Sequence, residues 1–151
     1  MAELLTLAAV ARWLLYAGAL VAVGRGTVAF LDPEWKAGAR SVHDTVGPRM
    51  VARLAAVALL AAVSLLLWGQ LTALEMTRAD IPVLLGQTSW GLGWSQLAGA
   101  SALAAIALLL PMGRTTSLML LMAALGVAVA MGGLGHAAAD EQWPIGARLL
   151  D

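Results

Sequence analysis

The chain has 151 residues, of which 61% are hydrophobic and only 12% are charged. Soluble domains average about half apolar and a quarter charged residues, so this composition excludes an ordinary soluble domain and favours a protein embedded in lipid. The absence of cysteine excludes disulfide frameworks, thiolate metal sites and cysteine nucleophiles, and the zero net charge gives no reason to expect nucleic-acid binding.

Four apolar runs follow one another along the chain, at residues 4–31, 51–74, 84–110 and 115–139. Each is long enough to cross about 30 Å of hydrocarbon, and backbone groups in lipid must be paired within their own segment, which predicts helices. The N-terminus lacks the basic region of a signal peptide, so the first run is expected to be a retained helix. The connection at 111–114 is short enough to make the last two helices an antiparallel hairpin. We expect a single transmembrane domain spanning 1–151, an all-α, integral membrane antiparallel four-helix bundle.

The distribution of Lys and Arg predicts the orientation of this bundle. One side holds six basic residues: Arg25, Lys36, Arg40, Arg49, Arg53 and Arg114. The other side holds three: Arg12, Arg78 and Arg148. Because basic residues are retained on the cytoplasmic side, both termini are expected on the outer face of the membrane.

The tryptophans and the start of the third run mark the predicted outer face. Five of the six tryptophans fall near outer helix ends and are typical of an aromatic belt: Trp13, Trp68, Trp90, Trp94 and Trp143. Thr88, Gly91 and Trp94 share one face at helical spacing and are expected to turn inward, since polar groups in lipid need partners. Gly91, Ser95 and Gly99 are interpreted as a close-packing ridge. For the tryptophans, the alternative is that some of them line a site or a partner interface at the outer face.

The fourth run carries small residues four positions apart, Ala124, Ala128 and Gly132, which predicts a face packed against other helices. The same stripe reaches His136, which follows Gly135 at the outer boundary. Imidazole is a good ligand for copper or zinc and can carry a proton at neutral pH, so a metal ligand or proton carrier is one interpretation of His136. The other is a histidine that bonds a helix-end carbonyl or water.

Further metal ligands are sparse. Met131 and Met76 are the methionines nearer the outer face, and thioethers are ligands for Cu(I), although methionine in an apolar helix usually serves packing. His43 lies in the inner loop, on the other membrane face from His136, so the pair is not expected to hold one haem. No catalytic motif is present in the sequence, and catalysis is not expected.

Three segments together resemble the N-terminal half of the copper resistance D (CopD-like) membrane proteins of bacteria. These are Arg12 to Leu20 (RWLLYAGAL), Thr88 to Trp94 (TSWGLGW) and Gly135 to Ala138 (GHAA). The resemblance implies copper handling in the inner membrane, either binding or passage. Of the family pattern, Gly135, His136 and the face formed by Thr88, Gly91 and Trp94 are carried over.

The chain also departs from that family. Its members continue into further helices bearing another histidine, whereas this sequence stops at Asp151, and Gln96 and Leu97 stand where a basic residue is usual. The alternative expectation is a non-catalytic accessory subunit of a larger respiratory or photosynthetic membrane complex. Copper is the one cofactor expected, and the expected partners are the lipid bilayer and either a homo-oligomer or a larger membrane complex.

Overall fold

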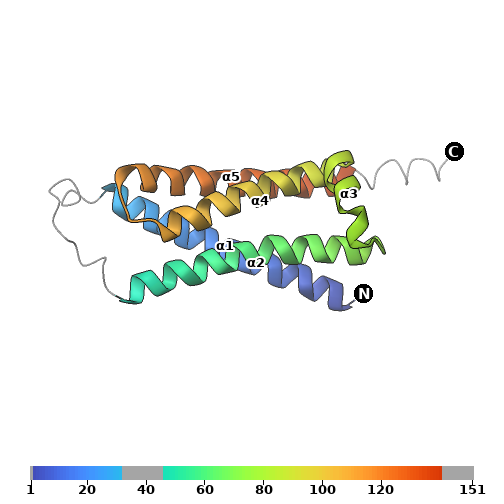
Figure 1. Ribbon diagram of the computed structural model, residues 1–151, viewed down its shortest axis with the longest axis horizontal. Coiled ribbons are helices and arrows are strands. Elements are labelled where there is room, and N and C mark those ends of the chain that lie inside the picture. Colours follow the sequence, from blue (N-terminus) through green and yellow to red (C-terminus); the bar gives the residue numbers. More distant parts are fainter. Residues whose placement is uncertain (1, 32–45, 141–151) are drawn as a thin grey trace.

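The protein is a bundle of long antiparallel helices (Figure 1). The computed structural model describes residues 2–31 and 46–140. In chain order the elements are α1 (Ala2–Leu31), α2 (Val46–Ala73), the 3-10 turn η3 (Arg78–Asp80), α3 (Ile81–Gln87), α4 (Ser89–Leu109) and α5 (Arg114–Asp140). Among the described residues, α1, α2, α4 and α5 are long and apolar enough to cross a membrane, which confirms the predicted all-α membrane bundle.

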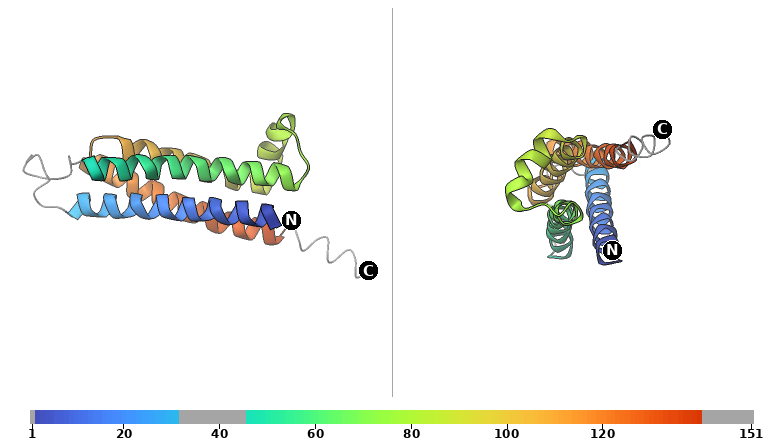
Figure 2. Two further views of the ribbon diagram at one scale, coloured as in Figure 1. Left: turned by 90° about the horizontal axis from the view of Figure 1, so that it is seen from below. Right: turned by 90° about the vertical axis from the view of Figure 1, so that its right-hand side faces the viewer.

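The four long helices surround one core. α1 packs against α2 and α5, and α4 packs against the same two helices from the opposite side, so α1 and α4 have little direct contact (Figure 2). α3 is a short arm that connects the end of α2 to the start of α4 and packs on α4. The end of the bundle that carries α3 also holds the start of α1 and the end of α5.

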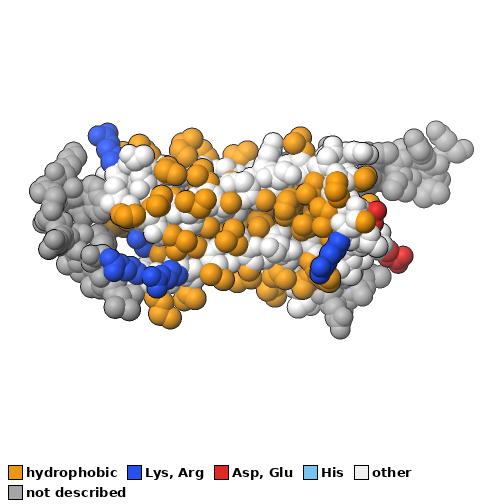
Figure 3. Space-filling view, in the orientation of Figure 1, with side chains coloured by type: hydrophobic (Ala, Val, Ile, Leu, Met, Phe, Trp, Pro, Cys, Tyr) orange, Lys and Arg blue, Asp and Glu red, His pale blue; other side chains and the backbone are white. Residues whose placement is uncertain are grey.

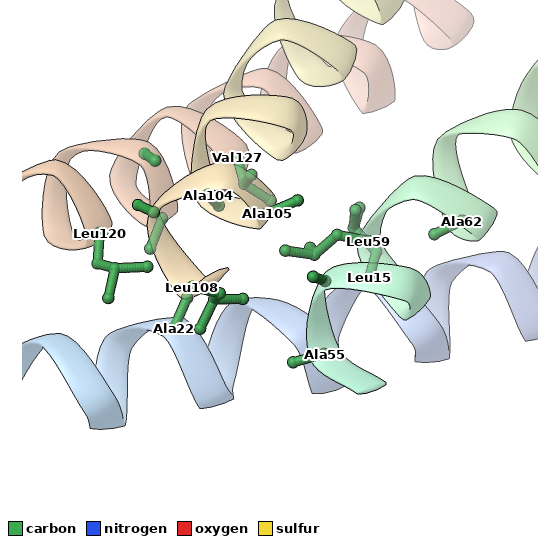
Figure 4. Close-up of a cluster of buried hydrophobic side chains, with 14 of the residues drawn as sticks. Leu15, Ala22, Ala55, Leu59, Ala62, Ala104, Ala105, Leu108, Leu120 and Val127 are labelled. Carbon is green, nitrogen blue, oxygen red and sulfur yellow. The ribbon is translucent and has the colours of Figure 1, made fainter. Parts of the chain in front are cut away.

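The core is built mainly from alanine and leucine. Leu15, Leu59, Leu108 and Leu120 are almost completely buried, and they belong to one cluster with alanines such as Ala22 and Ala105 (Figure 4). Small side chains let helix backbones approach closely, which is the main source of packing energy when the surroundings are as apolar as the core. The middle of the bundle is therefore a closely packed apolar region.

The third predicted span is shorter than the sequence indicates. The sequence predicts one helix over residues 84–110, but the helix is interrupted at Thr88, whose backbone is extended (φ −119°, ψ 148°). The Thr88 hydroxyl accepts a hydrogen bond from the Gly91 amide at 2.8 Å and donates one to the Leu84 carbonyl at 2.6 Å. An N-cap threonine of this kind starts a new helix, so α4 alone makes the third crossing. Its 21 residues span about 31 Å.

The prediction of which face of the last helix packs against its neighbours is also largely wrong. Ala124 is buried, but Ala128 and Gly132 are exposed, and a Cβ atom added to Gly132 would meet nothing within 4 Å among the described residues. The buried face of α5 runs instead through Ser117, Leu120, Ala123, Ala124, Val127 and Ala130. Small residues at spacing four define a face of the helix, but lipid and a packed core are both apolar and do not distinguish which face turns inward.

Charged side chains separate along the bundle axis. On the face shown in Figure 3, most basic side chains gather at the end where α2 begins and α4 joins α5, and acidic side chains lie at the opposite end. Arg49, Arg53 and Arg114 are exposed at the basic end. Arg25 is half-buried there, and its Nη1 atom donates a hydrogen bond to the Pro48 carbonyl at 3.2 Å, which joins α1 to the first turn of α2.

Candidate functional site

Thr88, Gly91 and Trp94 lie at the end of the bundle that carries α3. Thr88 caps α4, and Gly91 is buried beneath α3, where an added Cβ would lie 2.6 Å from the Leu85 Cα atom. Trp94 is half-buried, and its indole Nε1 donates to the Val63 carbonyl of α2 at 3.0 Å. All three residues therefore act in the structure as contacts that hold α3, α4 and α2 together.

The ridge predicted from Gly91 through Ser95 to Gly99 does not form within the chain. Ser95 and Gly99 are exposed, and the Ser95 hydroxyl donates back to the Gly91 carbonyl of its own helix at 2.9 Å. An added Cβ at Gly99 would meet nothing within 4 Å among the described residues. Gly91 alone of the three is a close-packing position.

Two of the predicted belt tryptophans lie on the outside of the bundle, since Trp13 is 74% exposed and Trp68 is 53% exposed. Trp90 is half-buried, and Trp143 lies outside the described residues. An exposed indole on a membrane bundle is typical of a side chain at the headgroup level. Trp94 differs from Trp13 and Trp68 because its indole N–H donates a hydrogen bond within the protein.

The predicted metal ligands lie at different depths. Gly93 of α4 lies against Leu134 of α5, and the Trp94 indole donates a hydrogen bond to the Val63 carbonyl of α2. These residues therefore lie at similar depths along the bundle axis. Met131 precedes Leu134 by one helical turn, whereas Met76 follows the end of α2 at Ala73. The Met76 amide donates to the Leu71 carbonyl at 2.9 Å, so the chain folds back here, and Met76 lies at the end of α2 while Met131 lies within α5.

The backbone of α5 continues as a helix through Gly135 and His136 to Asp140, although the side chains of residues 135–140 lie outside the described part of the structure. Positions 136 and 140 are one turn apart and share a face of α5. His43 also lies outside the described residues. Within the residues whose side chains are described, no group of three or more His, Cys, Asp or Glu residues comes together.

No family model matches the chain, and neither a curated protein nor a solved structure shows significant similarity to it.

The turn before α3 is held by Asp80, which lies outside the membrane-spanning segments. The pKa of Asp80 is lowered because its carboxylate accepts hydrogen bonds from the Thr77 hydroxyl at 2.7 Å and the Thr77 amide at 2.8 Å. A pKa below the unfolded value means that this turn is stabilised while Asp80 is ionised. That contribution is lost as the pH falls through the lowered folded-state pKa.

The opposite end of the bundle holds a cavity that the sequence did not indicate. It has a volume of about 380 Å³ and is lined by α1, by α2 and by Met112 from the connection between α4 and α5. Its apolar wall includes Val21, Val28, Val51 and Ala52, and Arg25 is the charged side chain among its described lining residues. The only sequence feature that marks it is the pair Gly24-Arg25, a missing side chain beside a charge within an apolar helix.

Proposed function

We propose that the protein handles copper at the outer face of a bacterial inner membrane, with His136 as the central ligand. The observation that carries this proposal is the continuation of α5 through Asp140, which puts a histidine and a carboxylate on one helix face at the end of the bundle. Imidazole suits copper, and a carboxylate is an available second ligand. The resemblance of the segments around Arg12, Thr88 and Gly135 to CopD-like proteins supports the same assignment.

Binding at this end is favoured over passage through the bundle. The buried polar or charged side chains of the described residues are Ser101 and Ser117, and the surrounding core consists of Ala, Leu and Val. The Ser117 hydroxyl donates a hydrogen bond to the Gly113 carbonyl at 3.0 Å. An ion that leaves water needs ligands along its whole path, and a closely packed aliphatic core offers very few.

Removal of the imidazole tests the copper proposal. Purified protein in detergent is expected to retain copper after dialysis, as measured by elemental analysis, and His136→Ala is expected to abolish this retention. Asp140→Asn is expected to weaken it, because one ligand on the same face is lost. His43→Ala is the matched control and is expected to leave copper retention unchanged.

The melting temperature of each variant, followed by circular dichroism, separates loss of a ligand from loss of the fold. Copper retention that is equal in wild type and His136→Ala would overturn the proposal, as would a wild-type protein that retains no copper in either oxidation state.

The orientation proposed for this function has both termini on the outer side, supported by the gathering of Arg49, Arg53 and Arg114 at the other end. The chain has no cysteine, so single cysteines report one position each. In intact cells, a membrane-impermeant thiol reagent is expected to label Ala79→Cys and to leave Thr115→Cys unlabelled until the membrane is opened. The reverse pattern would invert the orientation and move His136 to the cytoplasmic side.

A second candidate function, a non-catalytic subunit of a larger membrane complex, is favoured by a different observation. Gln96 is exposed on α4, about 10 Å along the axis from the start of this helix, and its amide has no hydrogen-bond partner among the described residues. Gly99 is exposed on the same face of α4. Gly132 and Gly133 of the neighbouring α5 are also exposed, and a Cβ atom added to either would meet nothing within 4 Å among the described residues. A polar side chain beside small residues is typical of the contact between transmembrane helices.

Substitution of Gln96 tests this second function. Gln96→Leu removes the amide but keeps the volume, and it is expected to lower the mass of the assembly extracted in mild detergent, as measured on native gels. Interhelical hydrogen bonds in membranes contribute about 0.6 kcal/mol on average and up to roughly 2 kcal/mol, so partial dissociation is expected. Gln87→Leu on α3 is the control. A wild-type protein that migrates as a monomer, or an assembly unchanged by Gln96→Leu, would argue against this candidate.

A further inference from the structure

The cavity at the basic end has the size and lining of a ligand site. Its volume of about 380 Å³ falls within the range of small-molecule pockets, roughly 300 to 1,000 Å³. Val21 and Val28 of α1 and Val51 of α2 contribute to an aliphatic wall, and Arg25 brings a guanidinium to the same space. A long apolar wall with one cationic group matches a molecule that is itself apolar along most of its length and anionic at one end.

The missing side chain of Gly24 on α1 leaves open space at the cavity. Gly24 lines it, is exposed, and an added Cβ there would meet nothing within 4 Å among the described residues. By contrast, Gly18 and Gly26 of the same helix lie against α2 and α5 respectively. The space at Gly24 is thus open while the neighbouring glycines of α1 are used for close packing.

The charges around Arg25 favour an anion. Among the described residues, the half-buried guanidinium donates to the Pro48 carbonyl, and a guanidinium carries five N–H donors. Arg49 follows Pro48 directly in α2, so a second positive charge stands at the same end of the cavity. A phosphate diester would accept the bidentate hydrogen bonds for which Arg25 is suited.

The position along the bundle identifies the source of such an anion. Arg25 lies six residues before the end of α1, which is about 9 Å along the helix axis, while Val21 lies one turn deeper in the apolar span. Arg49 and Arg53 are exposed on α2 at the same end of the bundle. The guanidinium is therefore near the level of lipid headgroups, and the aliphatic wall extends toward the hydrocarbon.

We propose that this cavity binds an acidic phospholipid, with its headgroup phosphate on Arg25 and one acyl chain along Val21 and Val51, which lie on the hydrocarbon side of Arg25. The site does not depend on the copper proposal, because it lies at the opposite end of the bundle. The bound lipid bridges α1 and α2 at the point where Arg25 already contacts Pro48.

Native mass spectrometry of the full chain in detergent tests the proposal, with phosphatidylglycerol and phosphatidylcholine of identical acyl chains as the two probes. Both lipids offer Arg25 the same phosphate diester, but the choline cation of phosphatidylcholine is repelled by the basic residues at this end of the bundle. Wild type is therefore expected to bind phosphatidylglycerol about tenfold more tightly, a difference of about 1.4 kcal/mol. Arg25→Gln is expected to remove this preference, and Gly24→Leu is expected to weaken binding of both lipids by filling the cavity. Because the added side chain enters open space, Gly24→Leu is expected to keep the wild-type melting temperature.

Two matched controls separate the cavity from the general surface. Arg114→Gln removes an exposed charge at the same end, and Gly99→Leu adds the same bulk to an open position on α4. Both are expected to leave lipid binding unchanged. Equal binding of the two lipids by wild type, or an equal effect of Arg114→Gln and Arg25→Gln, would overturn the proposal. Displacement of phosphatidylglycerol by millimolar inorganic phosphate, together with unchanged binding in Gly24→Leu, would show an anion site without a lipid.

Discussion

Replacing Gly18 with valine is expected to disrupt the contact between α1 and α2 and to produce a large loss of stability. A Cβ atom on Gly18 would lie 2.6 Å from Cγ of Leu59 and 3.1 Å from the Ala55 carbonyl oxygen. Leu59 is fully buried in the core, so its side chain has no free direction in which to move. Overpacking of this kind costs about 1–3 kcal/mol, and the two additional methyl groups of valine place the expected loss at the upper end.

The measurement is the melting temperature in detergent, followed by circular dichroism, with Gly24→Val as the matched control. Gly24 lies six residues away on the same helix and has open space at its Cβ position. Both variants replace glycine with a β-branched residue, so their intrinsic effect on helix formation is the same. A melting temperature lowered equally in the two variants would assign the loss to helix propensity and would contradict the proposed α1–α2 contact.

Replacing Gly91 with alanine is expected to have the second large effect, and it acts on the arm formed by α3. The added methyl group would collide with the Leu84 carbonyl oxygen and would lie 2.6 Å from Cα of Leu85. Both obstacles are backbone atoms of α3, so rotation of a side chain cannot relieve the collision. The expected result is displacement of α3 from α4, at a cost of about 3 kcal/mol or more.

Proteolysis within η3 and α3 reports this displacement, because a displaced arm is accessible to protease in detergent. Gly93→Ala and Gly99→Ala are the controls. At Gly93 the added methyl group would lie 3.1 Å from a terminal methyl group of Leu134, which is able to rotate, and at Gly99 it would meet nothing within 4 Å. Cleavage of Gly91→Ala at the wild-type rate would show that α3 tolerates the added methyl group and would contradict the tight contact.

The sequence was sufficient to predict the membrane bundle, because crossing a bilayer demands about 20 apolar residues in a helix and four runs satisfy this demand. The break at Thr88 was missed for a physical reason. Thr88 lies in a short polar stretch with Gln87 and Ser89, and such a stretch is equally compatible with the inward face of one continuous helix. The decisive interactions are the two hydrogen bonds of one hydroxyl group. An N-cap threonine three residues before Gly91 was the available sequence indication.

The site was less predictable than the fold. The exposure of Ala128 and Gly132 could not be inferred, because helix faces toward lipid and toward protein have the same apolar composition. The cavity beside Arg25 depends on how α1 and α2 diverge near Gly24 and Pro48, which is a property of packing rather than of either segment alone. The assignment of His136 as a copper ligand stays a prediction.

The unequal lengths of the helices have a consequence for the membrane in which the protein resides. The candidate spans of α1 and α2 cover 26 and 27 residues, or about 39 and 40 Å, whereas that of α4 covers 21 residues, or about 31 Å. A bilayer with a hydrocarbon thickness of about 30 Å matches α4 when it stands upright, but α1 and α2 must tilt or extend beyond it, as they do if Arg25 lies at the headgroup level. A thicker bilayer would draw α1 and α2 upright while exceeding the length of α4. Bilayer thickness therefore acts on the angle between the α1–α2 pair and α4, where hydrophobic mismatch is concentrated in this bundle.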